Sequence, residues 1–322
     1  MENLSREVKK YKWTYRFIDK GDDSDFEIIP EIPIPLPETL YKFYALNNFS
    51  LDALLKSYIY APSPHEVNDL FDCDASLIEF GSFNDVFSVL KGGYSEDEAK
   101  LLWDNNPDLI KEIFRTRIYL NSGIISLTKE INSNQIWAYY TNHQGFSIEF
   151  VHSEFKFKHY GPFPINYQDE IIPISTSESG YLAMLYQTNI KTIKWKHEKE
   201  WRIFIANLNQ NDNREIYKIP GINYDTIYAE RKFNYSQESI KSITFGYRFF
   251  DIDERIDELD TIKITLKNNV YMKMAFLNHI INQPYKKMFL YKDKSFFKLI
   301  PYEISIYKID NFNYELKKAA SL

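Results

Sequence analysis

The order of the predicted strands and helices constrains the fold of this sequence more than any other feature. Short apolar stretches typical of strands recur at irregular intervals, and helical patterns separate only some of them. The strands are expected at 10–18, 38–46, 57–62, 123–128, 146–151, 215–219, 239–247, 261–266 and 303–309. A doubly wound α/β chain would alternate strands and helices regularly, so this order predicts an α+β fold with split sheets and packed helices.

Four segments have the pattern of helices, and three carry a capping residue. Ser50 is expected to cap a helix over 50–57, and Ser95 with Glu98 forms a capping box before a helix that restarts at Pro107. A short helix after Ser133 or Asn134 should end at Gly145. The amphipathic pattern of 178–194 predicts a long helix.

Closely spaced prolines divide the beginning of the chain. Pro30, Pro33, Pro35 and Pro37 leave no room for a helix or a central strand, so residues 26–37 are predicted to be an extended connector. The resulting division is an N-terminal segment and connector over 1–37, a main domain over 38–250 and an extension over 251–322.

Cysteine content and charge restrict the compartment and the partners. Cys73 is the only cysteine, and the N-terminal residues lack the apolar core of a signal peptide, so a soluble cytoplasmic protein without a membrane segment is expected. The oligomeric state stays open.

Residues 261–322 are basic, with 11 lysines against 4 acidic residues, or +7, so the first 260 residues carry −13 of the total charge of −6. Such an extension either docks on an acidic body or contacts nucleic acid, and we expect docking. An alternation of Tyr271, Lys273 and Ala275 with Met272, Met274 and Phe276 indicates an apolar face that needs cover.

The segment KWKHEKEWRIFI, residues 194–205, contains a Glu-x-Glu pair before a buried strand. Alternation would place Trp201, Ile203 and Ile205 on the core face and Glu198, Glu200 and Arg202 on the other. Two carboxylates at this spacing either share one pocket or belong to a structural row of ion pairs at a strand edge.

Three patches in order resemble a bacterial protein family, the domain-of-unknown-function family 2971. They are IYAPSPHEVNDLFDCD (59–74), ISLTKEINSNQIWAYYTNHQGFSIEF (125–150) and KWKHEKEWRIFI, and SIKSITFGYRF (239–249) is similar to the closing strand of the family. The resemblance covers roughly residues 38–250. Leu70 stands where the family usually has proline.

The same segments are more distantly similar to the arginine-serine-glutamate class of ADP-ribosyltransferases. A basic strand residue (Lys42), strand hydroxyls (Ser126 and Thr128) and the Glu198-x-Glu200 pair occur in that order, although Lys42 stands where arginine is usual. The resemblance implies NAD as substrate, a pocket shaped by the hydroxyl strand, and catalysis by the last glutamate.

Cleavage of the nicotinamide–ribose bond passes through an oxocarbenium-like state, which a fixed carboxylate stabilises. Glu200 is the expected catalytic group, and Glu198 would orient or deprotonate the acceptor. The predicted NAD-binding residues are Lys42, Tyr44, Ser126, Thr128, Tyr140, His143 and Arg202: an aromatic ring would stack on nicotinamide, and Lys42 or Arg202 would pair with the pyrophosphate.

Three hypotheses about function remain. The first is an NAD-using ADP-ribosyltransferase or NAD glycohydrolase that acts as a phage-defence or toxin effector, with a protein or nucleic acid as acceptor. The second is a non-enzymatic sensor that binds a nucleotide-type ligand or a partner. The third is a metal-dependent nuclease built on Asp69, Asp72 and Glu149, although no metal-ligand spacing of histidines supports it and we predict no metal site.

Overall fold

The computed structural model describes residues 4–20, 25–84, 87, 95–106, 108–109, 122–175, 180–206, 231–293, 295 and 298–319. Within these residues the fold is α+β, with a large, mostly antiparallel sheet and few helices. The predicted strand at 215–219 and the helical restart at Pro107 lie outside the described residues.

The chain divides into two compact units that differ from the predicted domains. Unit 1 comprises Met1–Leu36, Tyr60–Ser126 and Lys158–Phe233, and unit 2 comprises Pro37–Ile59, Leu127–Phe157 and Asn234–Leu322. Residues 38–250 are therefore shared between the units, and 251–322 belong to unit 2. Three strands begin in one unit and end in the other along the sequence: β5 (Tyr58–Tyr60), β7 (Ser122–Thr128) and β14 (Lys232–Asn234).

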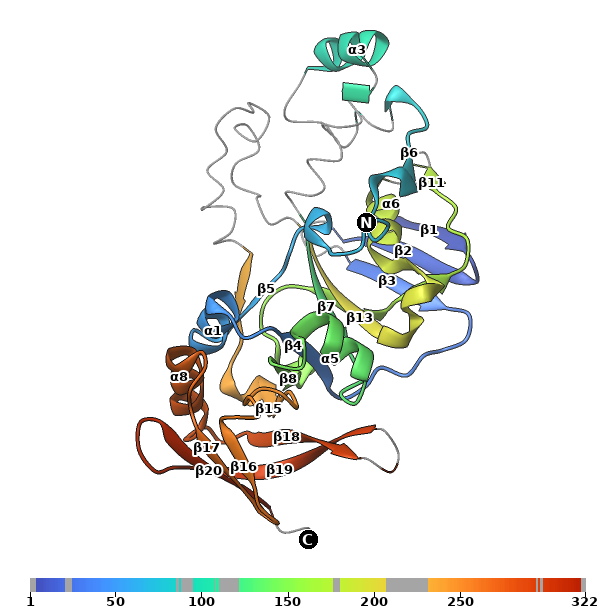
Figure 1. Cartoon of the computed structure of the whole chain (residues 1–322). Helices are drawn as coiled ribbons and strands as arrows, with labels where there is room; N and C mark the ends of the chain where they lie inside the picture. Colours follow the sequence, from blue (N-terminus) through green and yellow to red (C-terminus); the bar gives the residue numbers. More distant parts are fainter. Residues whose placement is uncertain are drawn as a thin grey trace. The chain divides into compact units, whose positions relative to one another are not determined.

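Unit 1 begins with a three-stranded antiparallel sheet of β1 (Leu4–Lys10), β2 (Trp13–Asp19) and β3 (Asp25–Pro30), drawn in blue in Figure 1. Residues 26–30, predicted as part of the connector, are thus a strand. Pro30 is its last residue, where a missing N–H is tolerated. Helix α6 (Gly180–Asn189) packs on this sheet, with the Tyr15 and Tyr186 rings 5.4 Å apart.

The remaining elements of unit 1 are short. β13 (Glu200–Ala206) lies between β7 and β9 (Tyr160–Pro164), and pairs with β9 in antiparallel fashion. The others are β6 (Ile78–Glu79), α3 (Glu96–Asn105), β10 (Asn166–Gln168), β11 (Ile174–Ser175), β12 (Ile190–Thr192) and the 3₁₀ turns η2 (Pro64–Glu66), η3 (Ala75–Leu77) and η5 (Ile193–Glu198).

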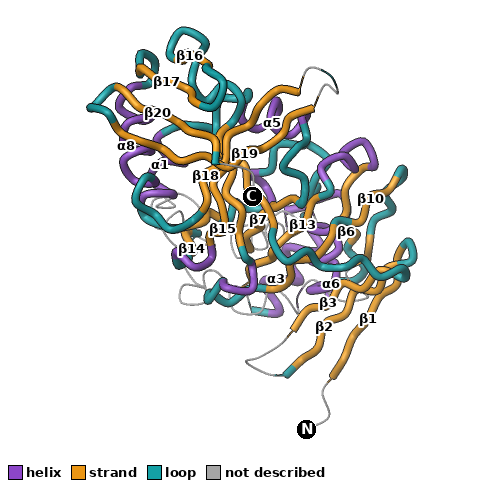
Figure 2. The backbone as a smooth tube through the Cα atoms, turned by 90° about the horizontal axis from the view of Figure 1, so that it is seen from below, coloured by secondary structure: helices purple, strands orange, loops and turns teal. Residues whose placement is uncertain are grey.

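Unit 2 contains the larger sheet, in the order β16-β17-β20-β19-β18-β15-β8-β4, in which β15 and β18 pair in parallel. The strands are β4 (Leu40–Tyr44), β8 (Phe146–Phe150), β15 (Ile240–Phe245), β16 (Arg255–Asp257), β17 (Thr261–Thr265), β18 (Lys286–Asp293), β19 (Lys298–Lys308) and β20 (Asn313–Lys318). Figure 2 shows β18, β19 and β20 side by side. The helices are α1 (Asn48–Leu55), α5 (Asn134–Thr141) and α8 (Val270–Ile280), with the 3₁₀ turns η4 (His152–Glu154) and η6 (Gln237–Ser239).

The C-terminal extension is part of this sheet. Residues 286–289 of β18 pair with 242–245 of β15, and α8 contacts α1, so the extension packs against residues of the predicted main domain. The alternation expected at 271–276 is wrong, because this segment is the helix α8. Its buried residues Lys273, Phe276, Leu277 and Ile280 follow helical spacing.

Candidate functional site

The Glu-x-Glu pair lies at a junction between two elements in unit 1. Glu198 ends η5, Lys199 adopts a left-handed conformation with φ of 45°, and β13 begins at Glu200. The predicted alternation is therefore wrong for Glu198, which does not belong to the strand. It holds from Glu200 onward, and both carboxylates are buried, at 4% and 5% exposure.

Both faces of β13 are buried. Trp201, Ile203 and Ile205 are core residues, as expected. The opposite face is also inaccessible, since Arg202 is only 3% exposed. A solvated edge of ion pairs is thus excluded for this strand, and the charged side chains must find partners inside the protein.

Arg202 uses all five of its N–H groups. Its Nε and Nη2 donate to Glu200 at 2.6 and 3.1 Å, while Nη1 and Nη2 donate to the two oxygens of Asp72 at 2.8 and 2.5 Å. The fifth bond runs from Nη1 to the Thr188 carbonyl oxygen at 2.8 Å. The guanidinium is therefore a clamp between two carboxylates that are far apart in the sequence.

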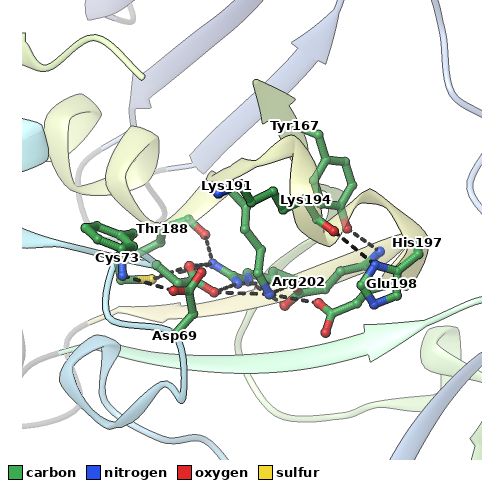
Figure 3. Close-up of polar contacts among 12 residues, drawn as sticks. Asp69, Cys73, Tyr167, Thr188, Lys191, Lys194, His197, Glu198 and Arg202 are labelled. Carbon is green, nitrogen blue, oxygen red and sulfur yellow. Dashed lines mark hydrogen bonds and ion pairs between the residues drawn. The ribbon is translucent and has the colours of Figure 1, made fainter. Parts of the chain in front are cut away.

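Lys191, on β12, places its ammonium group among the same carboxylates. Its Nζ lies 2.8 Å from Glu198, 3.1 Å from Glu200 and 3.3 Å from Asp72. The contacts with Glu198 and Glu200 are hydrogen bonds, and the contact with Asp72 is an ion pair. Figure 3 shows Lys191 beside Arg202, with Glu198 on one side and Cys73 on the other. We call Asp72, Lys191, Glu198, Glu200 and Arg202 the buried ion cluster.

The cluster holds three carboxylates against two cations. Burial alone raises the pKa of Glu200, but the charges of Arg202 and Lys191, with hydrogen bonds from Arg202 and Ser126, outweigh it and lower that pKa to about 2. Burial likewise lowers the pKa of Lys191, and the neighbouring carboxylates, Glu200 above all, reverse the effect and raise it. Glu200 and Lys191 are therefore both charged at neutral pH.

The surroundings of the cluster fix it in place. The Glu200 N–H donates to the Tyr167 hydroxyl at 2.9 Å, and Gln187 donates to the Cys73 carbonyl at 2.6 Å. Burial, then the charge of Asp72, raises the pKa of the Cys73 thiol. Cys73 is consequently an unreactive neighbour, since the thiolate is the reactive form.

A small cavity lies beside Arg202. A cavity of about 10 Å³ lies against Arg202, Thr188 and Asn189. Such a volume holds one water molecule at most. Glu200 itself is 5% exposed, and the open cleft that the NAD hypothesis predicts beside it stays a prediction. The hydrogen bond with Ser126 agrees with the predicted proximity of these two strands.

The other predicted binding residues belong to unit 2. Lys42 and Tyr44 lie on β4, with the Lys42 Nζ 5.8 Å from the Tyr44 ring centre, and Tyr44 stacks on Phe146. Thr128 ends β7. Tyr140 lies on α5, and His143 follows that helix in a left-handed conformation with φ of 60°. The structure thus joins Ser126, Glu198, Glu200 and Arg202 in unit 1, and Lys42 with Tyr44 in unit 2.

The nuclease hypothesis has no geometric support. Both oxygens of Asp72 accept from Arg202, and Glu149 accepts from Thr39 and Ser242 at 2.7 and 2.6 Å. Among the described residues, no group of three or more His, Cys, Asp or Glu could hold a metal ion.

Unit 2 contains a larger pocket that the sequence did not indicate. Its volume is about 320 Å³, within the size range of small-molecule sites. It is lined by residues from the loop between β4 and α1, from α5 and the turn after it, from the loop after β15 and from the start of α8: Ala45, Leu46, Ala138, Tyr139, Tyr140, Thr141, Asn142, Gln144, Arg248, Phe249, Asp251, Asn269 and Lys273. Of the predicted binding residues, Tyr140 lines it.

Helix α5 explains why tyrosines face this pocket. Ile136, Trp137 and Thr141 are buried, with the Trp137 ring packed 4.7 Å from Phe43. Tyr139 lies two residues beyond Trp137, which is more than half a turn of an α-helix. Its side chain is 67% exposed. Anchoring one face of the helix in the core therefore directs the other face to the pocket.

Comparisons of the chain with protein-family models, with curated proteins and with solved structures find no match. No helix in the described part of the chain is long and apolar enough to cross a membrane. The resemblance to the family of unknown function stays a prediction.

Proposed function

We propose that the protein is a non-enzymatic binding module whose unit 2 pocket takes a small anionic ligand. The observation that supports this most directly is Arg248. It lines the pocket, is exposed, and has no carboxylate partner among the described residues. A guanidinium in a concave site matches the oxygen geometry of phosphates and carboxylates.

The other charged groups at the pocket pair with one another. Asp251 accepts from Asn268 at 3.0 Å and from the buried Lys273 at 3.4 Å. Lys273 also pairs with Glu254 at 2.5 Å. Two carboxylates thus face the single ammonium group of Lys273, a local charge of −1, and Arg248 is the cation of the lining that has no carboxylate partner among the described residues.

The beginning of α8 also borders the pocket. Asn269, at its N-cap, lines the pocket, its side chain makes no capping bond, and no acidic residue occupies the first turn. Glu254 lies at this end of the helix, where its Oε1 accepts from the backbone N–H groups of Lys267 and Asn268 at 2.7 and 2.8 Å, so a carboxylate already offsets the positive end of the helix dipole.

The test is calorimetric titration with inorganic phosphate, pyrophosphate and ribose 5-phosphate at constant ionic strength. We expect saturable binding of at least one, weakened roughly tenfold or more in Arg248→Gln, the scale of one charge-assisted hydrogen bond. Lys298→Gln, an exposed cation of the same unit, is the matched control and should bind like the wild type. Binding that is absent, or equal in Arg248→Gln, would refute the proposal.

One observation favours a second candidate, the NAD-using ADP-ribosyltransferase-like enzyme. Glu200 bonds with Ser126, the pairing expected between the catalytic glutamate and the hydroxyl strand in that resemblance. Incubation with NAD and measurement of released nicotinamide tests it. Turnover that disappears in Glu200→Gln while the protein stays folded would establish NAD cleavage at this site, whereas absence of turnover leaves the binding module.

A further inference from the structure

We infer that the ligand of the unit 2 pocket is a mononucleotide, whose phosphate pairs with Arg248 and whose base stacks on Tyr139. This inference rests on the proposed anion-binding function. The proposed function concerns only the phosphate, and the inference adds that the rest of the ligand carries a nucleobase.

The tyrosines that line the pocket favour a ligand with a planar ring. Tyr139 exposes 67% of its surface although it lines the pocket, and Tyr140 follows it on the same helix. The core contacts of Trp137 on the other face of α5 hold this helix, so the backbone that carries the Tyr139 ring is fixed beside the pocket. Aromatic side chains stack on every nucleobase because each base has a π-face.

The remaining lining favours a base over a plain apolar ring. Asn142, Gln144 and Asn269 contribute amide groups, and each amide carries both donors and an acceptor. The edges of nucleobases also combine donors and acceptors, and amides recognise them in pairs. Asn142 is held by the left-handed end of α5, with φ of 49° and its N–H bonded to the Ala138 carbonyl.

The volume restricts the ligand further. The pocket holds about 320 Å³, which is near the lower limit for sites that enclose most of a small molecule. A mononucleotide suits such a site, whereas a dinucleotide such as NAD would leave its second half outside. The pocket should therefore prefer AMP to NAD.

The experiment compares AMP, ribose 5-phosphate, adenosine and NAD by calorimetry on the full chain. AMP should bind at least tenfold more tightly than each of the other three. Tyr139→Ala should weaken AMP binding about tenfold, the scale of one base–aromatic stack, and leave ribose 5-phosphate unchanged. Arg248→Gln should weaken both. Tyr271→Ala removes an 83% exposed tyrosine of unit 2 that does not line the pocket, and should change neither.

The outcomes distinguish the mononucleotide assignment from the proposed anion-binding function. If ribose 5-phosphate binds as tightly as AMP through Arg248, the mononucleotide assignment is overturned and the anion-binding function stands. The assignment is also overturned if NAD binds more tightly than AMP, or if Tyr139→Ala and Tyr271→Ala behave alike. If no phosphate compound binds, the proposed function fails as well.

Discussion

Replacing Glu200 by Gln tests whether the buried ion cluster stabilises unit 1. The carboxylate accepts from Arg202 through both oxygens and from Lys191 through one. Gln replaces one carboxylate oxygen by an NH₂ group, which is a donor and would face the N–H donors of Arg202 and Lys191. The lowered pKa gives the magnitude independently, because a shift from 4.5 to about 2 corresponds to about 3 kcal/mol of stability at pH 7. Loss of one partner from a buried ion pair costs about 3–5 kcal/mol, which agrees.

The pH dependence gives this prediction a distinctive form. Because the pKa of Glu200 is lower in the folded than in the unfolded state, its contribution is present above about pH 4.5 and is lost as the pH falls toward 2. The difference in unfolding free energy between wild type and Glu200→Gln should thus be about 3 kcal/mol at pH 7 and less than half of that at pH 3.

Urea denaturation followed by tryptophan fluorescence measures the difference, since four of the five tryptophans lie in unit 1 and only Trp137 in unit 2. Glu27→Gln is the matched control. Glu27 also pairs with an arginine at 2.6 Å in unit 1, but near the surface, where such a pair contributes about 0–1 kcal/mol. Equal effects of the two substitutions, or a Glu200→Gln effect that does not shrink with pH, would refute the reasoning.

Three further predictions follow from burial. Trp201 is a large side chain that is 4% exposed. Trp201→Ala should therefore leave a cavity and cost about 3–5 kcal/mol in urea denaturation, and a loss under about 1 kcal/mol would contradict its core position. Cys73 is buried and its thiol pKa is raised, so it should react with a thiol reagent at neutral pH only after urea unfolds the protein, and fast labelling of the native state would contradict this. Lys273→Met strands the buried Glu254 and should destabilise unit 2 by about 3–5 kcal/mol. A double Lys273→Met, Glu254→Gln variant that is no more stable than the single variant would show that the pair is not coupled.

Local signals in the sequence predicted local structure well. The Ser95–Glu98 capping box and the Ser133 cap both appear at the predicted positions. The cap of α1 is Asn47 instead of Ser50, because Ser50 is the third helical residue and completes a capping box with Asn47. The sequence prediction therefore found Ser50, which takes part in the cap, and missed Asn47, which is the N-cap.

Turns without their usual residues were harder to predict. Tyr11 and Lys12 connect β1 to β2 with φ of 49° and 66°. Asn or Gly is normally preferred at such positions, so one strand over 10–18 was expected in place of a hairpin. The long helix predicted for 178–194 ends at Asn189, and β12 and η5 follow, because Ile190 and Thr192 pair with β10. Pairing with distant strands overrode the local pattern in both places.

Only part of the buried ion cluster could be predicted from the sequence. Glu198, Glu200 and Arg202 are visible as a motif, but Asp72 and Lys191 are not, since only folding brings them to it. Without these two partners, a buried Glu-x-Glu pair indicates either catalysis or a surface edge. In the folded protein, every N–H group of Arg202 donates to a carboxylate or to a carbonyl oxygen, and each carboxylate has a cation within 3.3 Å. A carboxylate that stabilises a developing cation must be able to face the substrate, whereas these already face permanent cations. These contacts support a stabilising role for the cluster, whereas Arg248 lines a pocket and has no carboxylate partner among the described residues.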